Sequence, residues 1–161
     1  MSDLRDLYQE VILDHYKAPR NYGALDESAR IAHGNNPLCG DQIKVYVQLQ
    51  GDTVHQVSFE GHGCAISTAS ASLMTEAVAG KSKDDVERLS QTFRDLVTQE
   101  NGKQPSLPEG QRPDLEKLEV LAGVREYPIR IKCATLAWHA LAAAMKANPE
   151  DDNHTVSVTT E

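Results

Sequence analysis

Three cysteines and one aspartate are the residues of this chain best suited to chemistry. Cys39 lies in a turn-rich segment, and Asp41 follows two residues later. Because residues i and i+2 of an extended segment project to the same side, a thiolate and a carboxylate there can bind one ion. Cys64 and Cys133 each immediately precede a predicted helix, where unpaired backbone N–H groups and the helix dipole favour a thiolate. Three thiolates and a carboxylate are ligands that zinc binds tetrahedrally.

Ordinary interpretations of the same residues stay open. A cytosolic cysteine is most often a small buried hydrophobic residue, and the spacings between these three match no zinc-finger pattern. His62 is either a further ligand, a hydrogen-bond donor to a ligand, or a solvated loop residue. His139 projects away from Cys133 on the predicted helix and is interpreted as a packing residue. His15 is a candidate for the core, a helix cap or an interface.

Hydrophobic periodicity predicts the elements that position these residues. Helices are predicted over residues 3–17, 65–79, 114–122 and 134–145, with a further helix opening at the capping box 82–85. Strands are predicted over residues 30–33, 43–49 and 54–59. The order of helix, strands and helices predicts an α+β fold in two layers, with a small three-stranded antiparallel sheet packed against several helices.

Composition narrows the class of protein. The net charge of −8 over 161 residues argues against nucleic acid as a partner. A protein with this excess of negative charge offers little positive charge to replace the counterions around the phosphates. No apolar stretch reaches the length of a membrane span, and the first ten residues carry charges where a signal peptide needs an apolar core. Three cysteines without a secretory signal favour reduced thiols, and we therefore expect a cytoplasmic protein.

The chain is expected to form one domain over residues 1–147, with an insertion around residues 99–123 that is rich in proline and glycine. Residues 148–161 begin with a polar, acidic run and are expected to form a disordered tail.

Four segments together resemble the IscU/NifU-N family of iron–sulfur assembly proteins. These segments are residues 12–21, 36–41, 61–67 and 130–136, of which the last three each contain one cysteine. The similarity extends from about residue 4 to residue 147 and implies the SufU/IscU-like fold.

Three features are similar to the SufU branch of that family rather than to the IscU branch. Lys132 precedes the third cysteine where the scaffold proteins have a histidine ligand. Residues 126–130 lack the double-proline segment that is typical of those scaffolds, and the stretch between Cys64 and Cys133 contains a proline-rich insertion.

The SufU resemblance implies a zinc-dependent sulfurtransferase. Such a protein accepts persulfide sulfur from a SufS-type cysteine desulfurase and passes it toward a downstream iron–sulfur scaffold complex. Carried over to this sequence, the zinc ligands are Cys39, Asp41, Cys64 and Cys133, and Cys39 is the sulfur acceptor. Arg130 is either a residue that steadies this site or a solvated arginine on an extended segment.

Two other functions remain as alternatives. An iron–sulfur cluster scaffold can hold a transient [2Fe–2S] cluster with three thiolates and a carboxylate. A zinc-stabilised adaptor that only binds the desulfurase would need the same ligands but no reactive thiol.

Overall fold

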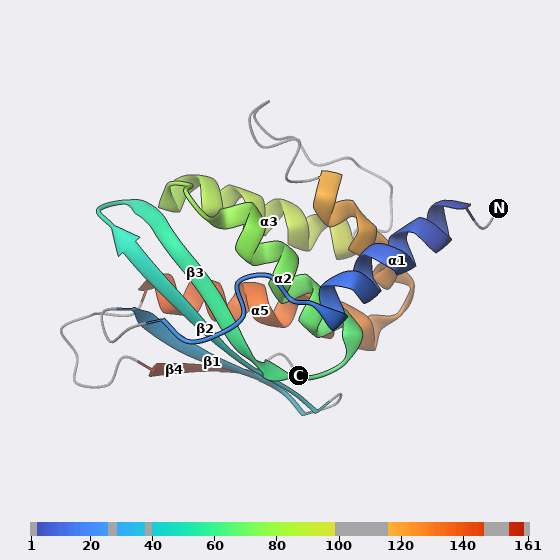
Figure 1. The fold of residues 1–161 in the computed structure, drawn as a ribbon, viewed down its shortest axis with the longest axis horizontal. Helices are drawn as coiled ribbons and strands as arrows, with labels where there is room; N and C mark the ends of the chain where they lie inside the picture. Colours follow the sequence, from blue (N-terminus) through green and yellow to red (C-terminus); the bar gives the residue numbers. More distant parts are fainter. Residues whose placement is uncertain (1–2, 26–28, 38–39, 99–115, 147–154, 160–161) are drawn as a thin grey trace.

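The computed structural model describes residues 3–25, 29–37, 40–98, 116–146 and 155–159 (Figure 1). Its elements, in chain order, are α1 (Asp3–Lys17), β1 (Arg30–Asn36), β2 (Asp41–Gln50), β3 (Thr53–His62), α2 (Ala65–Val78), α3 (Lys83–Thr98), the 3-10 helix η2 (Glu119–Glu126), α5 (Pro128–Lys146) and β4 (Thr155–Thr159). Among these elements, no helix combines the length and the apolar character that crossing a membrane requires.

The predicted three-stranded antiparallel sheet is confirmed, and a fourth strand extends it. The strand order is β3-β2-β1-β4, in which β1, β2 and β3 pair antiparallel. The strand β4 pairs parallel with β1, from Ile31 opposite Thr155 to Asn35 opposite Thr159. The expectation of a disordered tail over 148–161 is therefore wrong for Thr155–Thr159, where valines alternate with threonine and serine in a pattern that favours a strand.

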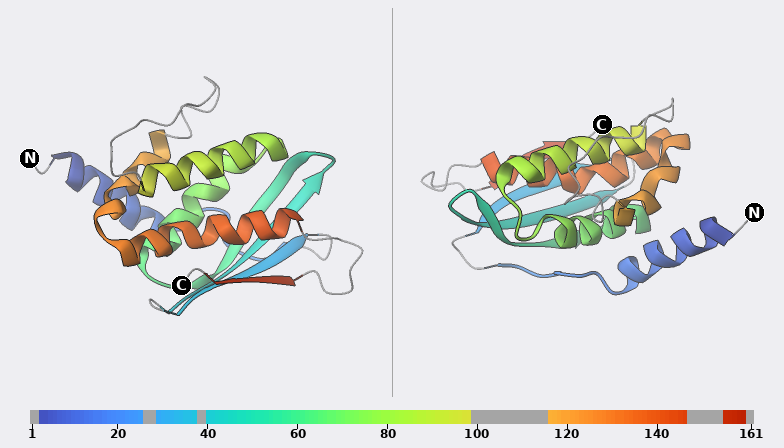
Figure 2. Two further views of the ribbon diagram at one scale, coloured as in Figure 1. Left: turned by 180° about the vertical axis from the view of Figure 1, so that it is seen from behind. Right: turned by 90° about the horizontal axis from the view of Figure 1, so that it is seen from above.

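Buried apolar and exposed polar side chains alternate along the strands, so one face of the sheet packs against the helices. This gives the two expected layers. Ala32, Val45, Val47 and Phe59 point to one face of the sheet and are buried there, because the helices α2, α3 and α5 gather on that face (Figure 2). Trp138 of α5 stacks on Phe93 of α3 with ring centroids 4.8 Å apart and fills the space between these helices. The opposite face of the sheet carries mostly polar side chains.

Two helix boundaries differ from prediction. The helix α5 begins at Pro128 rather than at Ala134, since proline has the φ angle of a first helical residue and loses no internal hydrogen bond there. The η2 helix continues through Gly123, which was expected to end a helix over 114–122. Of the predicted insertion, residues 99–115 lie outside the described part of the chain, and the buried Leu118 and Leu121 belong to the core.

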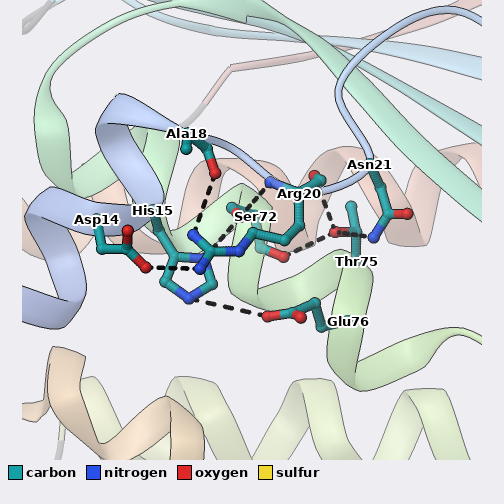
Figure 3. Close-up of polar contacts among 8 residues, drawn as sticks. All are labelled: Asp14, His15, Ala18, Arg20, Asn21, Ser72, Thr75 and Glu76. Atoms are coloured by element: carbon teal, nitrogen blue, oxygen red, sulfur yellow. Dashed lines mark hydrogen bonds and ion pairs between the residues drawn. The ribbon is translucent and has the colours of Figure 1, made fainter.

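The helix α1 is attached to α2 by a buried polar group (Figure 3). His15 Nδ1 lies 2.7 Å from Ser72 Oγ, and the backbone N–H of Arg20 donates to the same oxygen at 2.9 Å. The Ser72 hydroxyl can therefore donate to Nδ1, which leaves the proton of a neutral His15 on Nε2, 3.8 Å from the Glu76 carboxylate. Ser72 is completely buried, so this serine, histidine and glutamate hold α1 in place and present no nucleophile.

The chain after α1 runs along the outer edge of β3. Asn21 Nδ2 donates to Thr75 Oγ1 at 3.0 Å on α2 (Figure 3). Phe59 N donates to Asn21 O at 3.2 Å, and Gly23 N donates to Phe59 O at 2.9 Å. The same short segment thus contacts both the helical layer and the sheet.

Candidate metal centre

Asp41 enters the centre from the first position of β2. Its backbone pairs with Asn36, the last residue of β1, and both side chains lie on the helical face of the sheet with no exposed surface. The turn between the two strands includes Gly40 at φ +71°, a left-handed conformation that glycine adopts without steric cost. The alternation of the strand therefore directs the Asp41 carboxylate inward.

Cys64 lies at the N-cap of α2, as predicted. Its Sγ accepts a hydrogen bond from Ser67 N at 3.4 Å, and its own N–H donates to Asp41 Oδ1 at 2.8 Å. Gly63 makes this approach possible, because a Cβ at that position would lie 2.4 Å from Asp41 Oδ1. The helix N-terminus and the buried carboxylate are thus fixed against each other.

Cys133 reaches the centre from the interior of α5. The prediction that it precedes a helix is wrong, since it is the sixth residue of α5 and completely buried. The argument from unpaired N–H groups consequently does not apply to this thiol. Its Sγ instead lies 3.7 Å from Asn36 Nδ2, which donates to it.

The three side chains meet at one point. One ligand atom each from Asp41, Cys64 and Cys133 lies within 4.8 Å of the other two, close to the spacing of about 3.8 Å between two thiolates on one tetrahedral zinc. Asp41 Oδ2 and Asn36 Oδ1 are two of the three buried side-chain atoms in the described residues that have no hydrogen-bond partner. An unsatisfied buried polar atom costs about 1–3 kcal/mol. A metal ion would offset this cost at Asp41, so the donor set fits the implied zinc.

The remaining candidate residues lie elsewhere. His62 pairs with Gln42 rather than with Asp41, which puts its side chain on the opposite face of the sheet, and no histidine of the described chain joins the group. Arg130 is exposed in the first turn of α5 and not on an extended segment. His139 is further along α5, where burial lowers its pKa. Cys39 falls outside the described residues.

Two hydrogen bonds that sequence reasoning missed hold the end of β3, which leads into Cys64. The Tyr22 hydroxyl donates to Gly61 O at 3.0 Å and accepts from Gly61 N at 3.2 Å. Tyr22 also packs edge-on against Phe59, with ring centroids 5.2 Å apart.

Asn36 is a second residue that sequence reasoning missed. Its place beside the cysteine motif, at the same inward register as Asp41, was the available signal.

Comparison with known proteins assigns the chain to a family. A model of the NifU-like N terminal domain matches residues 7–154. The chain belongs to this family. Within it, the chain is 46% identical over 140 residues to the zinc-dependent sulfurtransferase SufU of Bacillus subtilis, covering 87% of this chain and 90% of that protein. It is 45% identical over 147 residues to the iron–sulfur cluster assembly scaffold protein IscU of Streptococcus pyogenes, covering 91% and 87%.

The fold is shared with a solved structure. The putative iron–sulfur cluster assembly scaffold protein for the SUF system from Fervidobacterium islandicum superposes with a TM-score of 0.71 at 33% identity. The match covers 85% of this chain and 95% of that one. The IscU-like fold is therefore confirmed. The nearly equal identities to a sulfurtransferase and to a scaffold do not separate these two functions.

Proposed function

We propose that this protein is a zinc-dependent sulfurtransferase of iron–sulfur cluster assembly, belonging to the SufU branch. It would accept persulfide sulfur on Cys39 from a SufS-type cysteine desulfurase and pass the sulfur to a downstream scaffold complex. The observation that carries this proposal is the convergence of Asp41, Cys64 and Cys133 within 4.8 Å. Ligand atoms so close together suit a single ion, whereas a [2Fe–2S] cluster distributes its protein ligands over two irons.

Cys39 would complete the donor set as the fourth ligand. Chain connectivity keeps its Cα within about 7.6 Å of the Asp41 Cα, since consecutive Cα atoms are 3.8 Å apart. When bound, zinc would keep these thiols deprotonated at neutral pH. Cys64, at a helix N-cap, and Cys133, inside a helix, are both held by regular structure. In the sequence, Cys39 falls between the end of β1 and the start of β2, and a connecting segment of this kind would let its thiol reach a partner.

The transfer step needs no oxidant. The Cys39 thiolate attacks the outer sulfur of the donor persulfide and forms a new S–S bond. The S–S bond of the donor breaks, and its electron pair leaves on the desulfurase cysteine as a thiolate. Cys39 then carries the persulfide, from which an added thiol reductant releases sulfide.

A second candidate function is that of a scaffold for a transient [2Fe–2S] cluster. The 45% identity to the scaffold protein of Streptococcus pyogenes favours it. Metal analysis and the visible spectrum of freshly purified protein separate the two functions. One equivalent of zinc in colourless protein supports the sulfurtransferase, whereas iron with visible absorption contradicts it and supports the scaffold.

Mixing the protein with a SufS-type desulfurase, cysteine and a thiol reductant tests the role of Cys39. We expect the wild type to raise multiple-turnover sulfide release and Cys39→Ser to abolish the increase. Without reductant, mass spectrometry should find the added sulfur on the peptide that contains Cys39. A fully active Cys39→Ser variant would instead identify a zinc-stabilised adaptor, and persulfide on Cys64 or Cys133 would refute the assignment of the acceptor.

A further inference from the structure

Asn36 is a buried polar residue whose position suits the metal centre better than the core. It is the last residue of β1, pairs with Asp41 across the sheet and has no exposed surface. Its Nδ2 lies 3.7 Å from Cys133 Sγ, and its Oδ1 has no hydrogen-bond partner. In a buried amide side chain, both the NH₂ group and the carbonyl oxygen normally have hydrogen-bond partners. In Asn36 only the end that faces sulfur is satisfied, so the sulfur orients this side chain.

The chemistry of the pair is directional. A thiolate accepts hydrogen bonds and an amide N–H donates them, whereas a carbonyl oxygen turned toward the same sulfur would be repelled. A hydrogen bond from N–H withdraws charge from a thiolate. A thiolate with less negative charge is a weaker nucleophile but can still bind a metal.

We infer that Asn36 is a positioning residue that donates a hydrogen bond to the Cys133 thiolate and keeps this sulfur a metal ligand rather than a second sulfur acceptor. The inference rests on the zinc centre of the proposed function. Burial supports the same role, because Cys133 has no exposed surface while Cys64 is partly exposed. Cys133 thus combines a side-chain donor with complete burial, whereas Cys64 accepts from the backbone N–H of Ser67 and is partly exposed.

Cobalt substitution tests this role without relying on transfer activity. The wild type, loaded with Co²⁺ in place of zinc, should show absorption from charge transfer between thiolate and cobalt. Asn36→Leu removes the donor at similar volume, and Asn36→Asp removes it while keeping an oxygen. Both variants leave more charge on the Cys133 sulfur, so we expect the band to move to longer wavelength.

Asn35 provides the matched control. It precedes Asn36 on β1 but is exposed on the opposite face of the sheet, so Asn35→Asp adds the same charge away from the centre and should leave the band unchanged. An unchanged band in Asn36→Asp would overturn the inference even if Asn36→Leu does not fold. Absence of any thiolate band in the wild type would instead overturn the metal centre, and with it the proposed function.

Discussion

Gly63→Ala should damage the metal centre through steric contact alone. The added Cβ would lie 2.4 Å from Asp41 Oδ1, 3.0 Å from Cγ and 3.1 Å from Cβ, so its three nearest neighbours all belong to one buried side chain. Rotation of the Asp41 side chain would relieve the contacts at Oδ1 and Cγ but would break the 2.8 Å hydrogen bond from Cys64 N, and the contact at Cβ would remain. A hydrogen bond to a charged acceptor is worth about 1.5–3 kcal/mol, and overpacking costs about 1–3 kcal/mol.

The expected loss of stability is therefore roughly 3–5 kcal/mol in the metal-free protein, which corresponds to a fall in Tm of about 10 °C or more. Displacement of the carboxylate should also weaken zinc binding by at least roughly tenfold. Urea denaturation measures the first effect and titration against a chromogenic zinc chelator measures the second.

Gly123→Ala is the control, because its Cβ would meet nothing within 4 Å and its backbone is not left-handed. It should leave zinc binding unchanged and alter stability by less than about 1 kcal/mol. Equal stability and zinc affinity in Gly63→Ala and Gly123→Ala would refute the steric reasoning.

Two further predictions concern the attachment of α1 and of the segment after it. Burial, reinforced by the Arg20 charge, lowers the pKa of His15 in the folded protein. The fold therefore favours the neutral imidazole. Its contribution to the free energy of unfolding is complete above the unfolded pKa of about 6.5 and is lost as the pH falls below that value. Urea denaturation from pH 7.5 to 5 should show that the free energy of unfolding falls less steeply with pH in His15→Gln than in the wild type. An identical dependence on pH in the two proteins would contradict this role of His15. Tyr22→Phe removes both hydrogen bonds to Gly61 and should cost about 1–2 kcal/mol, with faster hydrogen exchange at Gly61. Tyr16→Phe, on the exposed part of α1, should change neither quantity.

Local patterns were sufficient to predict much of this fold. Alternation of apolar and polar residues predicted β2 and β3 because each strand buries one face. The position of Cys64 at a helix start was also predictable, since glycines precede it and a helix-forming run follows. Both features depend only on neighbouring residues.

The predictions that were wrong involve longer-range effects. The extended segment on which one interpretation places Arg130 is instead the first turn of α5, because Pro128 has the φ angle of a first helical residue. The parallel pairing of β4 with β1 joins segments far apart in the sequence, which no local pattern encodes. Asn36 has the residue type of a turn former, and its contact with Cys133 became visible only when α5 was placed against β1.

The segment 21–23 along β3 and the strand β4 along β1 also affect how this protein behaves at high concentration. An unpaired strand edge exposes N–H and C=O groups that can recruit another chain and begin aggregation. In the described residues, each edge strand of the three-stranded antiparallel sheet is contacted by a segment from outside it, β1 by β4 and β3 by the residues around Tyr22. Each covering is a short segment, so it can detach while the core of Trp138 and Phe93 stays folded. Self-association should therefore begin with partial opening at the sheet edges rather than with global unfolding.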